Sequence, residues 1–229
     1  MEMGNKMIKK SIAIILFLFI SYAGIEFLKS SSKSCLLAQE EKLNVLLIVV
    51  DALRADHLGC YGYARNSSPE IDQLAKEGTL FTCVFSQGVL TRISIPSVFT
   101  SLYPNVHQVY KLDAPLAKEF MTLPEILKKY GYVTVAFAGS PVTSFSNFLD
   151  SSHSANRFDE YEVNIASAKR GQQSTLKYKF KVTPWITQKA ITWLKKPHLK
   201  PFFLYLHYYD VHPPYAPPRP YNKIFWPGE

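Results

Sequence analysis

The sequence has few cysteines and few glycines, and these shortages exclude several kinds of protein. Three Cys in 229 residues are too few for a small domain held together by disulfides, and ten Gly are too few for a collagen-like repeat. Disordered segments are poor in apolar residues, whereas 47% of this chain is hydrophobic. We therefore expect a globular domain with a hydrophobic core.

The sequence also lacks a basic tract, although basic residues outnumber acidic ones. Lys and Arg number 26 against 18 Asp and Glu, which gives a net charge of +8. The basic residues are scattered rather than gathered into a run that could follow a phosphate backbone. We therefore expect no nucleic acid partner. The same net charge suits a domain that lies beside an anionic membrane surface.

Long apolar runs are absent except near the N-terminus, where three lysines in the first ten residues precede an apolar stretch over residues 12–28. A cationic start followed by an apolar block is typical of an export signal. The uncharged part is shorter than the roughly 20 residues of a membrane-spanning helix, yet no small-residue cleavage site follows it. We predict that residues 1–28 are a signal anchor, with a cleaved signal peptide as the alternative.

The sequence after the export signal divides into a linker and a domain. Residues 29–42 are polar and rich in serine, which is typical of a linker, and the folded domain is predicted over residues 43–229. Export would place this domain on the periplasmic or extracellular side of the membrane. Cys60 and Cys83 would then lie in an oxidising compartment, but the sequence does not decide whether they pair.

Strand-like and helix-like segments alternate along the predicted domain. Continuous apolar runs, typical of strands buried on both faces, cover residues 45–50, 133–137 and 202–206. Capping residues predict helices between Ser68 and Gly78, between Thr122 and Gly131, and from Thr183 to about Lys196. This alternation predicts an α/β fold with a largely parallel sheet flanked by helices, where ligands bind beyond the carboxyl ends of the strands. The polar stretch 140–181 shows no periodicity, and we expect it to be a surface insertion.

Asp51 follows directly after the apolar run 45–50. A carboxylate at the end of a buried strand is costly unless a cation compensates its charge, and a divalent metal is the usual partner. The alternative is that Asp51 caps the turn that follows the strand. Asp56 and His57 lie further from the strand end, and we expect them on the surface.

Hydroxyl side chains recur at every third residue from Thr91 through Ser94 and Ser97 to Thr100. At this spacing they would follow one face of a helix, whose N-terminus is a suitable place for a sulfate or phosphate group. The alternative is that these hydroxyls are caps and hydrogen-bond donors to preceding carbonyl oxygens.

His212 stands where the apolar run 202–206 has passed into a loop with the sequence His-Pro-Pro. Each proline fixes its own φ near −65°, so the imidazole would be held rigidly at the edge of the sheet. His212 is therefore a candidate site residue, with a structural histidine beside a proline turn as the alternative.

In their order and spacing, these three segments resemble the sulfatase family of the alkaline-phosphatase superfamily, from Asn44 onward. The first resembles the family's strand-to-Asp metal motif. Residues 91–104 align without a gap to the family signature, and Lys200-Pro-Phe-Phe with the later His-Pro-Pro resembles its substrate loop. The resemblance implies that Asp51 and Thr91 bind a divalent cation such as Ca²⁺ or Mg²⁺. It also implies that Thr91 is the catalytic nucleophile and that His212 binds the substrate.

The sequence departs from the family at the nucleophile. Thr91 stands where most sulfatases carry the Cys or Ser that is converted to formylglycine, and Ile93 and Ile95 replace the Pro and Arg needed for that conversion. No formylglycine is therefore expected. Matching only Pro96-Ser97 to the signature would move the nucleophile to Ser94. That register requires a three-residue deletion, which would rotate the following helical face by most of a turn, so the ungapped register is preferred.

The sequence also departs from the family pattern at a residue expected to bind the metal and at residues expected to bind the substrate. Ala52 replaces the second Asp of the usual pair, and residues 138–141 lack the Lys and His expected to hold the sulfate. A Thr nucleophile resembles that of phosphoethanolamine and phosphoglycerol transferases. The resemblance therefore implies a metal-dependent, membrane-associated hydrolase of sulfate or phosphate esters, or alternatively a phosphotransferase acting on lipid head groups.

The family's second metal motif, an Asp-His-Gly-Glu or Asp-Asn-Gly loop, does not follow the His-Pro-Pro segment in this sequence. We therefore expect the chain to be the N-terminal part of a sulfatase-like catalytic domain, truncated at its C-terminus. An inactive fragment that lacks half of the metal ligands is the third alternative.

Overall fold

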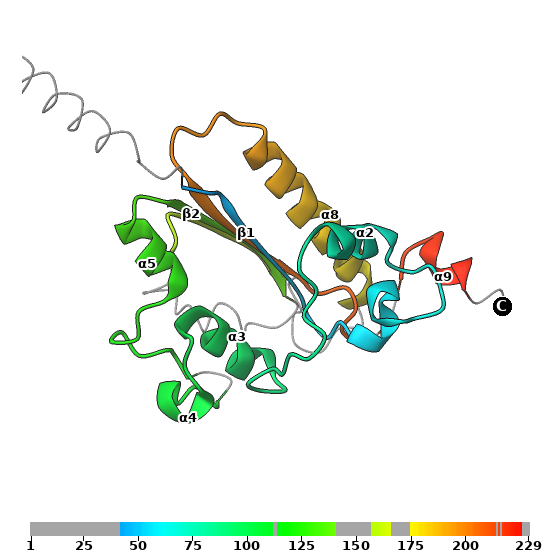
Figure 1. The fold of residues 1–229 in the computed structure, drawn as a ribbon, viewed down its shortest axis with the longest axis horizontal. Helices are drawn as coiled ribbons and strands as arrows, with labels where there is room; N and C mark the ends of the chain where they lie inside the picture. The colour runs from blue at the N-terminus through cyan, green and yellow to red at the C-terminus, as the bar shows by residue number, and fades with distance from the viewer. Residues whose placement is uncertain are drawn as a thin grey trace, which may run out of the picture. The chain divides into compact units, whose positions relative to one another are not determined.

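The computed structural model describes residues 42–111, 114–140, 157–165, 175–213, 215 and 217–225. Its centre is a four-stranded sheet in the order β1-β4-β2-β3, and all three pairings are parallel. The strands are β1 (Val45–Val50), β2 (Val133–Ser140), β3 (Glu160–Ile165) and β4 (Phe202–Tyr208). The expected α/β fold with a largely parallel sheet flanked by helices is confirmed (Figure 1).

Helices connect the strands and flank the sheet (Figure 1). The α-helices are α2 (Pro69–Glu77), α3 (Thr91–Thr100), α4 (Pro104–His107), α5 (Leu123–Lys129), α8 (Thr175–Leu194) and α9 (Tyr221–Ile224). Two short 3₁₀ helices, η1 (Ala55–His57) and η2 (Gly59–Tyr61), follow β1. The predicted strands over 45–50, 133–137 and 202–206 are thus confirmed, as are the helices that begin after Ser68 and Thr122.

Side chains alternate between the two faces of the sheet and form two hydrophobic clusters. On one face, Ile186 and other apolar residues of α8 pack against Val135 and Phe137 of β2. On the other face, Ile95 and Phe99 of α3 join Ala136 and other residues of β2 and β4. The central strands β2 and β4 are therefore covered on both faces, which explains why they are continuously apolar.

The capped start of α5 shows how the sequence defines a helix boundary. Glu125 Oε2 accepts hydrogen bonds from the backbone N–H and the hydroxyl of Thr122, at 2.8 and 2.6 Å. The same oxygen lies 2.9 Å from Nη1 of Arg157, whose side chain is 5% exposed. Thr122 therefore caps α5 as predicted, and a largely buried ion pair joins this helix to the chain segment that precedes β3.

Two expectations about the stretch 140–181 were wrong. Its residues 160–165 form strand β3, in which Tyr161 and Val163 pack against the core, while Glu162 between them pairs with Lys189 of α8 on the other face of the sheet. The helix expected to begin at Thr183 begins at Thr175 and runs through Pro184. A proline inside a helix removes one backbone hydrogen bond. Burial of the apolar face of α8 against the sheet offsets this loss. Residues 141–156 and 166–174 lie outside the described part.

The predicted export signal over residues 1–28 and the linker up to residue 41 also lie outside the described residues. Within the part of the chain that the structure describes, no helix is long and apolar enough to cross a membrane. The signal anchor therefore stays a prediction. Cys60 and Cys83 are free thiols in the structure.

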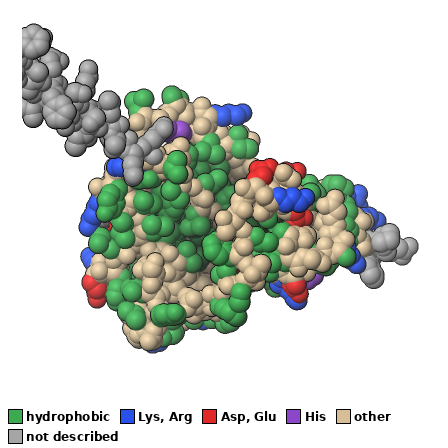
Figure 2. Space-filling view, viewed as in Figure 1, with side chains coloured by type: hydrophobic (Ala, Val, Ile, Leu, Met, Phe, Trp, Pro, Cys, Tyr) green, Lys and Arg blue, Asp and Glu red, His purple; other side chains and the backbone are tan. Residues whose placement is uncertain are grey.

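The described surface carries many large apolar side chains. β1 is an edge strand, and its Leu46 and Ile48 are 48% and 51% exposed. The segment between α2 and α3 contains Phe81, Phe85 and Val89, which are 68%, 79% and 98% exposed. Figure 2 shows hydrophobic side chains over much of the visible face. Exposed apolar area of this kind promotes association or binding.

Candidate active site

Asp51 lies at the carboxyl edge of the sheet. β1 pairs with β4 so that Val49 is opposite His207 and Val50 is opposite Tyr208. The backbone N–H of Asp51 then donates a hydrogen bond to the carbonyl oxygen of Tyr208 at 2.9 Å. Asp51 is thereby held where ligands bind in parallel α/β sheets, and its side chain is 12% exposed.

Thr91 is the first residue of α3, and the helix directs its hydroxyl at Asp51. Thr91 Oγ1 donates a hydrogen bond to Asp51 Oδ2 at 2.8 Å. The structure therefore brings together the two residues that the sequence singled out as nucleophile and metal ligand. Their chemical roles stay predictions.

The other hydroxyls of α3 make structural hydrogen bonds, which was the alternative to a role in binding sulfate or phosphate. Ser94 Oγ lies 3.4 Å from the carbonyl oxygen of Thr91, and Thr100 Oγ1 donates to the carbonyl oxygen of Pro96 at 2.7 Å. Ser97 is buried, and its hydroxyl lies 3.0 Å from His107 Nε2. Of the four hydroxyls, the one that reaches Asp51 belongs to Thr91, which favours the ungapped register.

His207 is a third member of the site, and it was not among the residues predicted from the sequence. It lies in β4 on the same face as Tyr205, is 3% exposed, and places Nε2 at 3.6 Å from Asp51 Oδ2. Its Nδ1 lies 2.9 Å from the hydroxyl of Tyr205. A histidine so near the end of the apolar run 202–206 was the signal that could have revealed it.

Burial and hydrogen bonding define the protonation of these groups. Burial raises the pKa of the Tyr205 hydroxyl well above its ordinary value, so the phenol keeps its proton. It can then donate to His207 Nδ1, which leaves the ring proton of a neutral His207 on Nε2, facing Asp51. Burial opposes the ionised form of Asp51, but the ring of His207 at 3.6 Å and the hydrogen bond from Thr91 outweigh it and lower the pKa of the carboxyl.

His212 lies in the loop after β4, where its ring stacks on Tyr209 at a centroid distance of 4.2 Å. Its Nδ1 lies 2.7 Å from the carbonyl oxygen of Pro213, so Nδ1 carries a proton and donates it. The charge of a protonated His212 is a further influence that lowers the pKa of Asp51, so the two groups are within electrostatic range. Burial, followed by the charge of Asp51, raises the pKa of Tyr209 to about 12.

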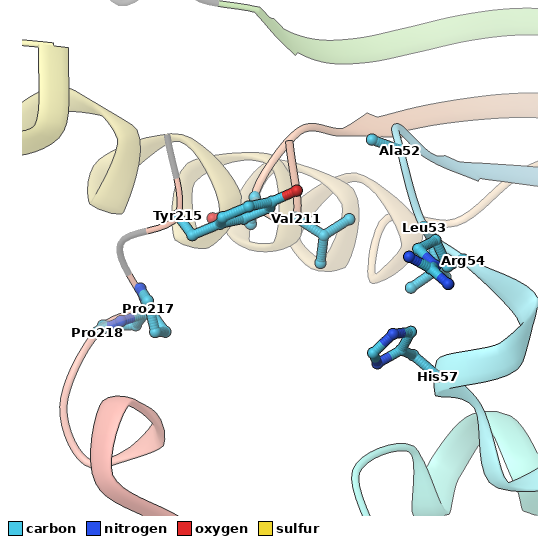
Figure 3. A pocket seen from close by; sticks show the side chains of 9 residues that line it. Ala52, Leu53, Arg54, His57, Val211, Tyr215, Pro217 and Pro218 are labelled. Atoms are coloured by element: carbon cyan, nitrogen blue, oxygen red, sulfur yellow. The ribbon is translucent and has the colours of Figure 1, made fainter. Parts of the chain in front are cut away.

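A pocket of about 560 Å³ adjoins the site. It lies between the loop after β1 and the loop after β4, and Ala52 at the end of β1 is part of its lining (Figure 3). Ala52 has φ +58°, a left-handed conformation that is uncommon for a residue with a Cβ. Asp56 and His57 are exposed, as expected, and Asp56 accepts a hydrogen bond from Arg54 Nε at 2.9 Å.

The site can be compared with the needs of a divalent cation. Asp51 Oδ2 and Thr91 Oγ1 are 2.8 Å apart. Neighbouring oxygen ligands around octahedral Mg²⁺ lie about 3.0 Å apart, because each is about 2.1 Å from the metal and they subtend a right angle. The two oxygens therefore fit a hard cation in type and spacing. Within the described residues, no group of three or more His, Cys, Asp or Glu side chains could hold a metal ion.

The sulfatase family model matches residues 43–225 of the chain. The chain belongs to the sulfatase family. It is 31% identical over 210 residues to iduronate 2-sulfatase from Homo sapiens, a match that covers 81% of this chain and 38% of that protein. The family predicted from the three sequence segments is thus confirmed.

Solved structures agree on the fold. The phosphonate monoester hydrolase of Agrobacterium radiobacter matches with a TM-score of 0.67 at 23% identity, covering 80% of this chain and 44% of that one. The C-terminal periplasmic domain of EcEptC from Escherichia coli, in complex with Zn, matches with a TM-score of 0.55 at 18% identity. That match covers 79% of this chain and 48% of that domain. The chain therefore spans less than half the length of these relatives.

Proposed function

We propose that this chain carries the nucleophile side of a metal-dependent site that cleaves sulfate or phosphate esters. The observation that carries the proposal is the contact of 2.8 Å between Thr91 Oγ1 and Asp51 Oδ2 at the carboxyl edge of the sheet. Membership of the sulfatase family, and the similarity to an iduronate 2-sulfatase and to a phosphonate monoester hydrolase, support this chemistry.

Asp51 and Thr91 would hold the divalent cation, with Ca²⁺ and Mg²⁺ as the first candidates. When bound, such a cation lowers the pKa of a coordinated hydroxyl and neutralises charge on the ester oxygens. His207 faces Asp51 and is itself held by Tyr205. This chain of contacts fixes the carboxylate and keeps it ionised, so that it remains available as a ligand.

Thr91 would attack the ester. A bond forms between Thr91 Oγ1 and the sulfur or phosphorus atom, and the bond to the leaving-group oxygen breaks with its electron pair. The hydroxyl proton of Thr91 points at Asp51 Oδ2 and would pass to that carboxylate, which is ionised before this step. His212 Nδ1 donates to Pro213, so Nε2 is the nitrogen left to face a ligand, and it would donate to an oxygen of the ester or of its leaving group when the ring carries a second proton.

The second step distinguishes the hydrolase from the first alternative. In a hydrolase, water attacks the sulfur or phosphorus atom and releases Thr91 with sulfate or phosphate. In a phosphotransferase, the hydroxyl of a lipid head group takes the place of that water. The Thr nucleophile and the predicted membrane anchor favour a lipid acceptor. The second alternative is an inactive module that binds anionic esters without cleaving them.

The proposal is tested with 4-nitrophenyl sulfate and 4-nitrophenyl phosphate in the presence of Ca²⁺, Mg²⁺ or Zn²⁺. Because the chain spans less than half of its relatives, the assay is run on this chain and on any longer product of its gene. Thr91→Ala is expected to lower kcat/KM by at least about a thousandfold. The matched variant Ser94→Ala, one helical turn away, is expected to retain activity within about threefold of the unaltered protein.

Two outcomes would overturn the proposed nucleophile. Activity that survives Thr91→Ala but is lost in Ser94→Ala would establish the shifted register. A folded protein that shows no turnover with any of the three cations, yet binds the esters, would establish the inactive module. An assay on vesicles of phosphatidylethanolamine with a lipid acceptor separates the transferase from the hydrolase. A transferase moves the head group to the acceptor lipid, whereas a hydrolase releases it into solution.

We also propose that residues 12–28 hold the domain on the periplasmic or extracellular side of a membrane. The three preceding lysines and the missing cleavage site support this arrangement. N-terminal sequencing of the protein from membrane and soluble exported fractions tests it. A mature chain that begins after residue 38 in the soluble fraction would identify a cleaved signal peptide instead.

A further inference from the structure

The segment between α2 and α3 presents apolar side chains to solvent immediately before Thr91. Within residues 81–89, which we call the apolar loop, Phe81 is 68% exposed. Val84, Phe85 and Val89 are 73%, 79% and 98% exposed. Apolar side chains that gather on a surface in this way mark a site of interaction with a protein or a membrane.

The apolar loop is held in place near both of its ends. At its start, the hydroxyl of Tyr61 in η2 donates a hydrogen bond to the carbonyl oxygen of Phe81 at 2.8 Å. Near its end, Gly88 packs so closely on α3 that a Cβ at this position would lie 2.5 Å from Cγ2 of Ile93. The exposed side chains of Val84 and Phe85 therefore stand on a stretch of backbone that is anchored on either side.

Polar groups at the tip of the apolar loop form hydrogen bonds within the loop. Ser86 Oγ donates to the carbonyl oxygen of Gly88 at 2.7 Å, and Gln87 Nε2 donates to the carbonyl oxygen of Phe85 at 3.1 Å. A polar group is costly to remove from water unless it keeps a hydrogen-bond partner. These two bonds lower the cost of moving the tip of the loop out of water.

Charges near the apolar loop are of one sign. From Gly78 to Lys111 the sequence contains no Asp or Glu, and its basic residues Arg92 and Lys111 follow the loop. Arg92 Nε donates to the carbonyl oxygen of Tyr110 at 3.1 Å, so the backbone beside Lys111 lies next to Arg92. Figure 2 shows hydrophobic side chains along the lower edge of the molecule, where Figure 1 places α3 and α4. Apolar side chains accompanied by cations and by no anion match the interface of an anionic membrane.

We infer that the apolar loop inserts into the interface of an anionic lipid membrane, with Arg92 and Lys111 beside the lipid phosphates. Val84 and Phe85 would leave water for the boundary of the acyl chains, which favours binding through apolar burial. A second copy of the chain is a less suitable partner, because it would bring a second pair of cations toward Arg92 and Lys111. Insertion would place Thr91 near the lipid head groups. The inference does not depend on ester cleavage, because the loop would bind lipid whether or not Thr91 reacts.

A fluorescent label on Cys83 tests the insertion in the full chain. Cys83 is an exposed thiol within the apolar loop, and replacing Cys35 and Cys60 with Ser leaves it as the single labelling site. The label is the polarity-sensitive dye NBD, and the vesicles contain phosphatidylglycerol and phosphatidylcholine. The matched control carries the label at Tyr130→Cys with all three natural cysteines replaced by Ser, because Tyr130 is 64% exposed and lies outside the loop. Both proteins keep residues 12–28, so attachment through that stretch is the same in both.

Insertion is expected to raise and blue-shift the emission of the label at Cys83 and to leave the label at position 130 unchanged. Replacing Val84 and Phe85 with Ser is expected to reduce the response at Cys83 by at least about half, because these two residues supply the apolar area of the tip. Vesicles of phosphatidylcholine alone are expected to give a smaller response, because Arg92 and Lys111 meet no anionic lipid there.

Three results would overturn the inference. The first is an absent response at Cys83, or an equal response at positions 83 and 130. The second is a response of the same size on phosphatidylcholine alone, which would exclude the selection of anionic lipid. The third is an emission at Cys83 that grows with protein concentration and that vesicles do not change, which would identify a second copy of the chain as the partner.

Discussion

Thr91 and Asp51 are forty residues apart in the sequence, yet the hydroxyl of Thr91 donates a hydrogen bond of 2.8 Å to the carboxylate of Asp51. One residue follows the edge strand β1 and the other begins α3. The contact therefore joins a strand end to a helix start, and the same two oxygens have the spacing of neighbouring metal ligands. Four predictions follow from this arrangement and from the packing around it.

Ala52→Asp is expected to increase the affinity of the chain for Ca²⁺ and Mg²⁺ by at least about tenfold, because it adds a second carboxylate beside Asp51. Asp also tolerates the left-handed conformation that Ala52 adopts at φ +58° better than Ala does. Calorimetric titration of metal into the variant measures the change. Ala52→Gly is the backbone control and is expected to leave metal affinity unaltered. An affinity that rises equally in both variants would contradict the prediction.

Asp51→Asn is expected to destabilise the fold at neutral pH by about 1–3 kcal/mol, because it removes the ionised acceptor of Thr91. The pKa of Asp51 is lower in the folded chain than in the unfolded chain, so ionised Asp51 stabilises the fold above its ordinary pKa near 4. This contribution is lost as the pH falls through the lowered value.

Urea unfolding between pH 7 and pH 3 measures this acid dependence. The stability of the unaltered chain is expected to fall more steeply below pH 4 than that of Asp51→Asn. Glu119→Gln, at an exposed position, serves as the surface control and is expected to behave like the unaltered chain. If the stability of all three proteins falls equally steeply below pH 4, the protonation of Asp51 is not coupled to folding.

Ser97→Ala is expected to lower the free energy of unfolding by about 1–3 kcal/mol, because it leaves a buried N–H without its acceptor. His107 is 2% exposed, and its Nδ1 accepts the backbone N–H of Val109 at 3.1 Å. The proton of the neutral ring is then on Nε2, which donates to Ser97 Oγ at 3.0 Å. Ser94→Ala, on the same helix but without a histidine partner, is expected to cost less than half as much. Equal losses from both substitutions would refute the role of the Ser97–His107 pair.

The exposed apolar residues between α2 and α3 are expected to cause self-association. Replacing both Phe81 and Phe85, which are 68% and 79% exposed, with Ser should reduce binding of the dye ANS and delay aggregation without lowering the Tm. Phe99→Ala is the contrasting variant, because Phe99 is 2% exposed and its truncation should cost about 3–5 kcal/mol. A Tm that falls in the double Ser variant as it does in Phe99→Ala would show that the two exposed rings are part of the core.

The sequence alone determined the strands and helix ends that depend on interactions between residues close together in the chain. Strands buried on both faces need continuous apolar runs, so β2 and β4 could be predicted. The apolar run of β1 and the position of Asp51 at its end could be predicted too, although Leu46 and Ile48 leave one face of this edge strand about half exposed. Capping is also local, which is why Thr122 marked the start of α5. β3 could not be predicted because it stands in a polar stretch at the edge of the sheet, where two of its described side chains, Tyr161 and Val163, pack against the core.

The tertiary structure alone decided which side chains meet. His207 contacts Asp51 because β4 pairs with β1, at a sequence separation that no local pattern can encode. The same pairing brings the loop of Arg54 to the loop of Tyr215, which forms the pocket. Helix α8 continues through Pro184 because burial of its apolar face outweighs a local breaker. In each case the deciding energy comes from contacts between segments far apart in the chain, and these exist only once the sheet has assembled.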